Sequence, residues 1–269
     1  MKIIDFHTHA FPDEIAERAM QKLQENCIVK PILNGTISDL LRSMDKNGIS
    51  TSVLCNIATR PEQFNPILKW SKSIRSERII PLLSIHPDDR HIKEHLKIVK
   101  KEGFPGIKMH PYYQNFSIDD EKAFYIYESL IENDLFIVMH CGYDISFPEW
   151  DIASPERILN VLNKFPELKF ITTHLGAWKQ WDEVEKLIIG KPVYMEISFS
   201  FGWLEDNKIR DFIIKHPSDY ILFGTDSPWS DQGREIENLK KLNLPDSLMS
   251  KILYLNARRL LNKNDSKTS

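Results

Sequence analysis

The sequence lacks the features of secreted, membrane-spanning and nucleic-acid-binding proteins. It has no apolar run near the ~20 residues that a membrane-spanning helix needs, and its opening residues, MKIIDFHTHAFPDE, become charged too early for a signal peptide. The three cysteines form no CxxC pair and are odd in number, as is typical of free thiols in a reducing compartment. A net charge of −3 gives no attraction to nucleic acid or to anionic membranes. We therefore expect a cytoplasmic protein whose partner is a small-molecule substrate. The oligomeric state, a homodimer included, stays open.

Also absent is the GxGxxG pattern of dinucleotide-binding folds. What recurs instead is a short apolar run of strand length, rich in Ile, Val, Phe or Leu. Eight such runs lie at residues 3–6, 52–57, 79–85, 106–109, 136–139, 169–172, 193–197 and 220–223. Amphipathic helical patterns separate them at residues 62–76, 90–101, 119–133, 155–164, 183–189 and 208–215. Alternating strand and helix predicts parallel strands joined by crossovers. Eight units favour a closed (β/α)8 TIM barrel over an open doubly wound sheet.

The first unit of this barrel is irregular. Its strand is separated by some thirty residues from the presumed helix near residues 38–47, so residues 11–31 are predicted to form a helical excursion over the barrel mouth. We assign residues 1–262 to a single domain. Residues 263–269 are polar and are predicted to form a frayed tail.

Ionisable side chains follow several predicted strands at the point where each strand ends. They are His7 and His9 after the first, Lys108 at the fourth, His140 after the fifth, His174 after the sixth and Asp226 after the eighth. In a barrel these carboxyl ends meet on one face, where barrel enzymes carry out their chemistry. Side chains alternate along a strand, so the imidazoles of His7 and His9 point the same way and can reach one ion.

This pattern predicts a divalent metal held by His7, His9, His140 and Asp226. Nitrogen and oxygen ligands without a thiolate suit zinc, and less often manganese, iron or cobalt. Each residue also has a structural alternative. The HxH pair can be accidental, His140 can be a hydrogen-bonded core histidine, and Asp226 can cap the next helix. The convergence of strand ends favours the metal site. His174 is either a ligand, a general acid/base or a buried structural histidine.

The motifs around these residues are DFHTH, GIKMHP, VMHCG, TTHLG, GTDSPW and the terminal NARRLL, spread from residue 5 to 261. Together they resemble the amidohydrolase superfamily, and within it the amidohydrolase-related (amidohydrolase 2) branch that includes aminocarboxymuconate-semialdehyde decarboxylase. The resemblance implies that His7, His9, His140 and Asp226 bind one metal and that His174 acts in catalysis.

Three further residues are candidates for substrate binding. In binuclear members of the superfamily a lysine at the fourth strand is carboxylated and bridges two metals. Lys108 is therefore such a bridge, a cationic anchor for a substrate carboxylate, or part of a salt bridge inside the barrel, and we favour the anchor. Arg60 is either a second carboxylate anchor or a solvated loop residue. Trp229 is predicted to line an apolar pocket, although exposed loop aromatics are common.

Two reactions are compatible with this site. The first is hydrolysis, in which metal-activated water attacks an amide, lactone or related ester of a small carboxylated substrate, and Asp226 or His174 moves the proton. The alternative is non-oxidative decarboxylation of a small carboxylic acid. His174 and Asp226 then manage protonation of the carbon that loses CO2. We expect the first, and the decarboxylase stays as the alternative, since the motifs alone do not separate the two. A non-catalytic metal-binding barrel is disfavoured, since an open coordination position implies exchange chemistry.

Overall fold

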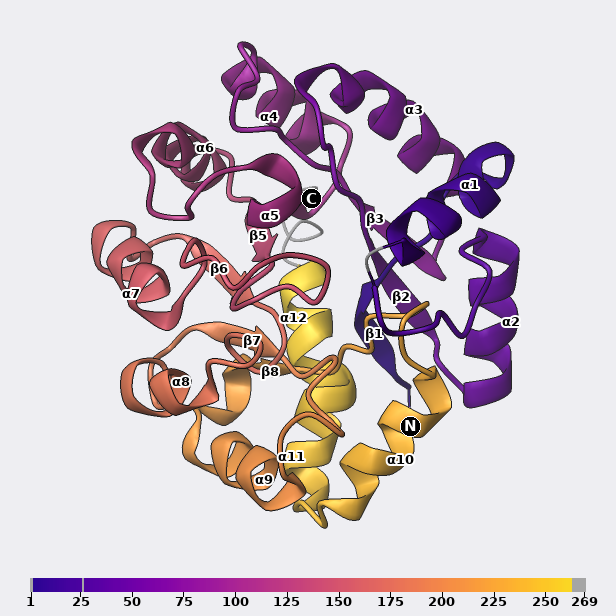
Figure 1. The fold of residues 1–269 in the computed structure, drawn as a ribbon, viewed down its shortest axis with the longest axis vertical. Helices are drawn as coiled ribbons and strands as arrows, with labels where there is room; N and C mark the ends of the chain where they lie inside the picture. Colours follow the sequence, from indigo (N-terminus) through magenta and orange to yellow (C-terminus); the bar gives the residue numbers. More distant parts are fainter. Residues whose placement is uncertain (1, 26, 263–269) are drawn as a thin grey trace, which may run out of the picture.

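The computed structural model describes residues 2–25 and 27–262, so the predicted frayed tail at 263–269 lies outside the described residues. Eight parallel strands form the centre of the molecule (Figure 1). They are β1 (Ile4–Thr8), β2 (Thr51–Cys55), β3 (Ile79–Leu82), β4 (Gly106–Met109), β5 (Phe136–Met139), β6 (Lys169–Thr172), β7 (Tyr194–Glu196) and β8 (Ile221–Leu222). Each of the eight lies within or overlaps a predicted apolar run.

Two seams close these strands into a barrel. At the first, Ile107 of β4 pairs with Leu83 just after β3, and the Lys108 N–H donates to the Leu83 carbonyl at 2.8 Å. At the second, the Phe6 N–H of β1 donates to the Phe223 carbonyl just after β8, also at 2.8 Å. Toward the carboxyl ends of the strands, the second seam continues as a bridge between Thr8 and Ser227. The predicted TIM barrel is therefore confirmed.

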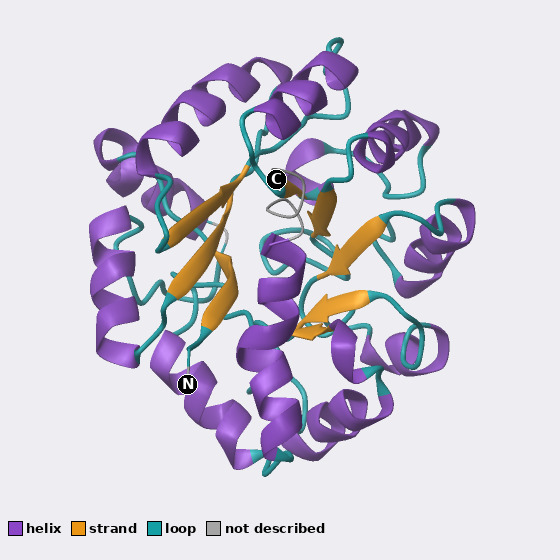
Figure 2. Cartoon of the chain, turned by 180° about the vertical axis from the view of Figure 1, so that it is seen from behind, coloured by secondary structure: helices purple, strands orange, loops and turns teal. Residues whose placement is uncertain are grey.

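Helices surround the strands on the outside (Figure 2). The outer ring contains α2 (Ile37–Asn47), α3 (Phe64–Ile74), α4 (Ile92–Lys101), α6 (Glu121–Glu132), α7 (Pro155–Lys164), α8 (Trp181–Leu187), α9 (Asp206–Lys215) and α10 (Gln232–Lys241). The excursion after β1 includes α1 (Asp13–Gln24), and a short α5 (Pro111–Gln114) follows β4. No helix in the described ranges is both long enough and apolar enough to cross a membrane.

Local sequence explains why these helices begin and end where they do. The Thr36 hydroxyl accepts a hydrogen bond from the Asp39 N–H and caps α2, which ends at Gly48 in the left-handed conformation (φ 68°). The buried residues of α2, Leu40 and Met44, are four positions apart and therefore lie on one face. That face joins the large apolar layer between the strands and the outer helices.

The C-terminal segment covers the amino end of the barrel. It contains α11 (Asp246–Ser250), a π-helical turn (Lys251–Leu255) and α12 (Asn256–Asn262), which crosses the middle of the view in Figure 1. Ala257 and Leu260 of α12 pack against apolar residues from the strands, including Phe6 and Val138. The lower barrel interior is thus apolar and closed, which leaves the carboxyl ends of the strands for a polar site.

Candidate metal centre and active site

β1 places two imidazoles side by side at the carboxyl end of the barrel. The side chain of Thr8, between them, turns away and its hydroxyl donates to the Val53 carbonyl at 2.9 Å. The Nε2 atoms of His7 and His9 lie 3.1 Å apart. The HxH spacing therefore brings the two rings together as predicted.

The seam between β8 and β1 brings Asp226 to the same place. The Asp226 backbone N–H donates to the His7 carbonyl at 2.8 Å. Its Oδ1 lies 3.1 Å from His9 Nε2 and 3.5 Å from His7 Nε2. Asp226 does not cap the following helix, since α10 is capped by Asp231, whose carboxylate accepts from the Arg234 N–H.

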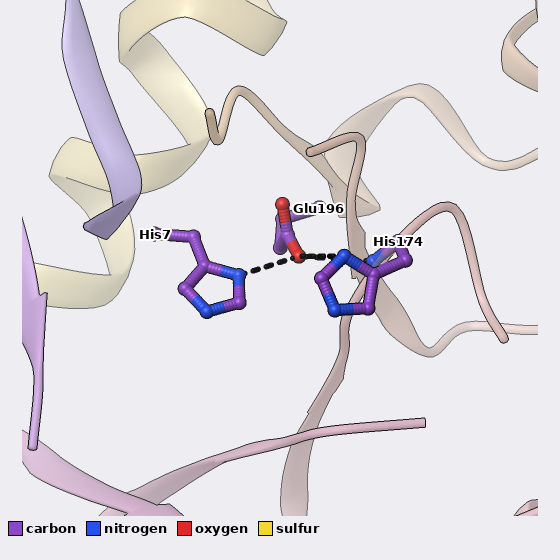
Figure 3. A group of neighbouring side chains, drawn as sticks. All are labelled: His7, His174 and Glu196. Carbon is purple, nitrogen blue, oxygen red and sulfur yellow. Dashed lines mark hydrogen bonds and ion pairs between the residues drawn. The ribbon is translucent and has the colours of Figure 1, made fainter. Parts of the chain in front are cut away.

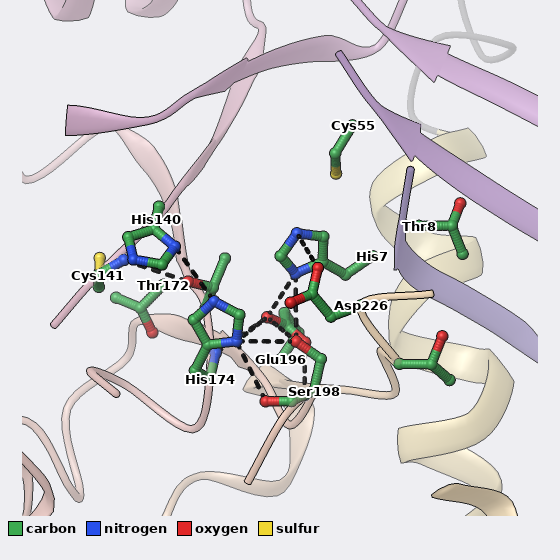
Figure 4. A network of polar contacts seen from close by, with 12 residues as sticks. His7, Thr8, Cys55, His140, Cys141, Thr172, His174, Glu196, Ser198 and Asp226 are labelled. Atoms are coloured by element: carbon green, nitrogen blue, oxygen red, sulfur yellow. Dashed lines mark hydrogen bonds and ion pairs between the residues drawn. The ribbon is translucent and has the colours of Figure 1, made fainter. Parts of the chain in front are cut away.

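His140 and His174 form a second pair of facing imidazoles (Figure 4). His140 Nδ1 and His174 Nε2 are 3.2 Å apart. The ring of His174 is also tilted toward that of His7, with 5.4 Å between the ring centroids. His174 and Leu175 both have left-handed backbone (φ 58° and 55°), a conformation that non-glycine residues rarely adopt and that clusters at functional sites.

Hydrogen bonds to acceptor-only groups define the tautomer of each ring. His7 Nδ1 lies 2.9 Å from Glu196 Oε1, and His9 Nδ1 lies 2.8 Å from the Cys55 carbonyl. His140 Nε2 lies 3.1 Å from the Tyr143 carbonyl, and His174 Nδ1 lies 3.2 Å from the Ser198 carbonyl. Carboxylates and carbonyls only accept, so these nitrogens carry the hydrogens. The opposite nitrogen of each ring therefore presents a lone pair.

These lone pairs face one another without a hydrogen between them. Burial, with the charge of Lys108 next, lowers the pKa of His7 well below its ordinary value. Burial, with His110 next, does the same to the pKa of His140. The facing ring nitrogens lie 3.1 Å apart in one pair and 3.2 Å apart in the other, and lone pairs at such distances repel unless a cation lies among them. The chemistry of this donor set fits a divalent metal.

The described residues contain three groups whose potential ligand atoms lie within 4.8 Å of one another. One is His7, His9 and Asp226, three of the four predicted ligands. His140 is not in that group; it contacts His174 instead, and belongs to a group with His110 and Asp144. The fourth predicted ligand, His140, therefore lies beside His174, whose ring in turn lies 5.4 Å from that of His7. The third group is His7, His174 and Glu196.

Glu196 is a site residue that the sequence analysis missed. It is the last residue of β7 and is fully buried, and its Oε1 accepts from His7 Nδ1 and from the His174 N–H, both at 2.9 Å (Figure 3). His110 and Asp144 were also missed. The rings of His110 and His140 stack at 4.0 Å, and His110 Nε2 lies 3.4 Å from Asp144 Oδ2. A charged residue inside the apolar run YMEIS was the available signal for Glu196.

Comparison with known proteins gives the family. A family model described as Amidohydrolase matches residues 4–263. The chain belongs to the amidohydrolase family. No curated protein matches the sequence significantly.

Solved structures with the same fold cover nearly the whole of this amidohydrolase. A TIM-barrel protein from Bordetella bronchiseptica is 19% identical with a TM-score of 0.79, over 97% of this chain and 98% of that one. A 5-carboxyvanillate decarboxylase from Novosphingobium aromaticivorans, complexed with manganese and 4-hydroxy-3-methoxy-5-nitrobenzoic acid, is 14% identical (TM-score 0.73; 97% and 96% covered). A dihydroxybenzoic acid decarboxylase from Polaromonas with bound manganese and 2-nitroresorcinol is 16% identical (TM-score 0.71; 98% and 97% covered). At these identities the similarity establishes the barrel fold.

Lys108 lies inside the barrel of this amidohydrolase and is fully buried. Its charge contributes to the lowered pKa values of His7 and His110, after burial in each case, so its side chain lies near the histidines. Within the described residues its Nζ has no hydrogen-bond partner. A salt bridge inside the barrel, one of the three predicted alternatives, is therefore not formed by these residues.

The two remaining substrate-binding candidates lie outside the histidine cluster. Arg60 is exposed, at the start of a 3-10 turn (Pro61–Gln63) after β2. Trp229 is half-buried, and its backbone N–H donates to the Asp226 carbonyl at 2.9 Å. Trp229 lines a cavity of about 350 Å³ together with Phe199, Phe201 and Trp203. The Phe199 ring lies 6.3 Å from that of His174, and charged side chains, among them Lys30 and Arg234, also line this cavity. The roles of Arg60 and Trp229 stay predictions.

Proposed function

We propose that this amidohydrolase is a metal-dependent, non-oxidative decarboxylase of a small carboxylic acid. The observation that carries the proposal is the cluster of His7, His9 and Asp226, whose potential ligand atoms lie within 4.8 Å of one another, beside the facing rings of His140 and His174. Decarboxylases among the similar structures support this choice over hydrolysis, and three of those structures hold manganese. Four aromatic side chains line one cavity, and one of them, Phe199, has its ring 6.3 Å from that of His174, an arrangement that suits a planar acid.

One divalent cation would be held by His7 Nε2, His9 Nε2 and Asp226, with His140 Nδ1 as the fourth ligand. The ligand types favour zinc, and manganese is the alternative suggested by the similar structures. When bound, the cation supplies positive charge that orients the substrate and stabilises negative charge that develops during the reaction. Lys108 is an unmodified ammonium at the floor of the site, where it attracts the acidic substrate.

His174 is the proposed proton donor. Decarboxylation breaks the bond between the carboxylate and its carbon, CO2 leaves, and the electron pair stays on that carbon. A proton must then be delivered to it. His174 is buried in the cluster with Nε2 on the side of His140, and its Nδ1 is held by Ser198, so Nε2 is the atom that can carry and deliver the proton. His174 Nε2 takes this proton up from solvent before each turnover, and after delivering it the ring is again neutral with its hydrogen on Nδ1.

Hydrolysis is the second candidate. The observation that favours it is the His140–His174 pair beside a buried Lys108, which could hold a second metal if the lysine were carboxylated. A two-metal site activates water for attack on an amide or ester.

The reaction products separate these candidates. The protein is loaded with manganese or zinc and incubated with ¹³C-carboxyl-labelled hydroxybenzoates and other small planar acids. We expect ¹³CO2 and the matching decarboxylated product in equal amounts, and no turnover after chelation until metal is restored. A chain that releases no ¹³CO2 but cleaves lactones or amides to new acids would replace the proposal by hydrolysis.

A further inference from the structure

A single buried carboxylate connects His7 of β1 with His174, which follows β6. Glu196 Oε1 accepts from His7 Nδ1, from the His174 backbone N–H and from the Ser198 hydroxyl, each at 2.9 Å. Its Oε2 accepts from the Ser198 backbone N–H at 2.7 Å. Four donors therefore satisfy a carboxylate that has no access to water.

The link from Glu196 to the ring of His174 is indirect. His174 Nδ1 lies 3.9 Å from Glu196 Oε1, which is too long for a hydrogen bond. Ser198 Oγ lies 3.0 Å from His174 Nδ1 and 2.9 Å from Glu196 Oε1 (Figure 4). Since the carboxylate only accepts, the Ser198 hydroxyl donates to Glu196 and accepts from His174 Nδ1.

The surrounding backbone is shaped to fit this carboxylate. A side-chain carbon at Gly224 would lie 2.3 Å from Glu196 Oε2, so the chain just after β8 can pass here only as glycine. The left-handed backbone of His174 is held by its N–H bond to Oε1. The next N–H, of Leu175, donates to the Glu196 carbonyl at 2.7 Å.

We infer that Glu196 and Ser198 are positioning residues for both halves of the site. Glu196 acts directly on His7 and, through Ser198, on His174. In each ring the hydrogen is held on Nδ1 and the Nε2 lone pair is turned toward the cluster. A partner of this kind fixes the tautomer and orientation of a metal-binding histidine and is worth ~10–100-fold in metal affinity. One carboxylate thereby couples metal binding to the orientation of the proposed proton donor.

Two substitutions separate the direct link from the indirect one. Glu196→Gln replaces an acceptor oxygen by a donor, which disturbs His7. Ser198→Ala removes the hydroxyl that joins Glu196 to His174 Nδ1 and that also lies 3.2 Å from His7 Nδ1, but it keeps the direct 2.9 Å bond from His7 Nδ1 to Glu196 and the Ser198 carbonyl beside His174 Nδ1. We expect Glu196→Gln to weaken manganese binding to the chelated, refilled protein by ~10–100-fold in calorimetric titration. Ser198→Ala is expected to leave that affinity unchanged. In ¹⁵N-histidine-labelled protein, the Nδ1–H signal of His7 should change in Glu196→Gln, and that of His174 in both variants.

Ser129→Ala is the matched control, because Ser129 is a buried serine of α6 whose hydroxyl has no partner among the described residues. It should behave as the parent protein in each measurement. The inference would be overturned if the Glu196→Gln variant folded and bound manganese as tightly as the parent protein. It would also be overturned if the Ser198→Ala variant lost as much manganese affinity as Glu196→Gln. If Glu196→Gln does not fold, Glu196→Asp, which shortens the reach, should show the same loss, and unchanged affinity there has the same meaning.

A kinetic readout rests on the proposed function: Ser198→Ala should lower kcat for decarboxylation and leave KM unchanged. The titration and the NMR spectra need no substrate. A protein that releases no CO2 but shows the expected affinities and tautomers would therefore refute the proposed reaction alone.

Discussion

Asp226→Asn is expected to lower turnover by ~10²-fold or more, because Asp226 is the one anionic group among the four proposed metal ligands and the loss of a ligand's supporting partner alone costs ~10–100-fold. The substitution keeps the size of the side chain and removes the charge that lies 3.1 Å from His9 Nε2. Asn also tolerates the left-handed backbone at this position (φ 60°), so the fold should persist. Steady-state kinetics and thermal unfolding of the purified variant measure the two effects separately.

Thr36→Ala provides the contrast of a helix cap outside the site. Thr36 caps α2, so its loss should cost ~1 kcal/mol of stability while turnover per folded molecule stays normal. The assignment of Asp226 would be wrong if Asp226→Asn unfolded the chain and its folded fraction retained normal turnover.

His174→Asn should have a comparable effect on catalysis without loss of metal. We expect kcat to fall by ~10²–10⁴-fold, because the proposed proton donor is removed. Asparagine again suits the left-handed backbone (φ 58°). Metal content, measured by elemental analysis, should stay at the parent level. His140→Asn should lose both metal and activity. If His174→Asn is as metal-poor as His140→Asn, then His174 is a ligand and the donor must be sought elsewhere.

The sequence predicted the barrel because its strands are marked by sharp composition changes. The bounds of β4, β5, β6 and α7 agree with the predicted runs. Elsewhere geometry altered them: β1 extends to Thr8 through a register shift between Asp5 and Thr8, and β8 is short because Asp226 turns back to β1. The role of α12 was not predicted, since an amphipathic C-terminal pattern does not reveal which end of a barrel it covers.

The site was predictable where strand ends alone determine it. His7, His9 and Asp226 meet because β8 pairs with β1 at the closing seam. The contact between His140 and His174 depends on left-handed backbone at His174, which no local pattern indicates. Glu196 was not predicted, because it lies inside the apolar run at 193–197 as the last residue of β7, whereas the predicted histidines and Asp226 follow their runs.

The most direct test of the central claim is anomalous diffraction from crystals of the manganese- or zinc-loaded protein. We expect one anomalous peak per chain, bonded to His7, His9, His140 and Asp226, with an unmodified Lys108 ammonium below it. The account would be contradicted by a chain without a peak, or by two peaks ~3.5–4 Å apart, as in two-metal sites, joined by a carbamate on Lys108 Nζ.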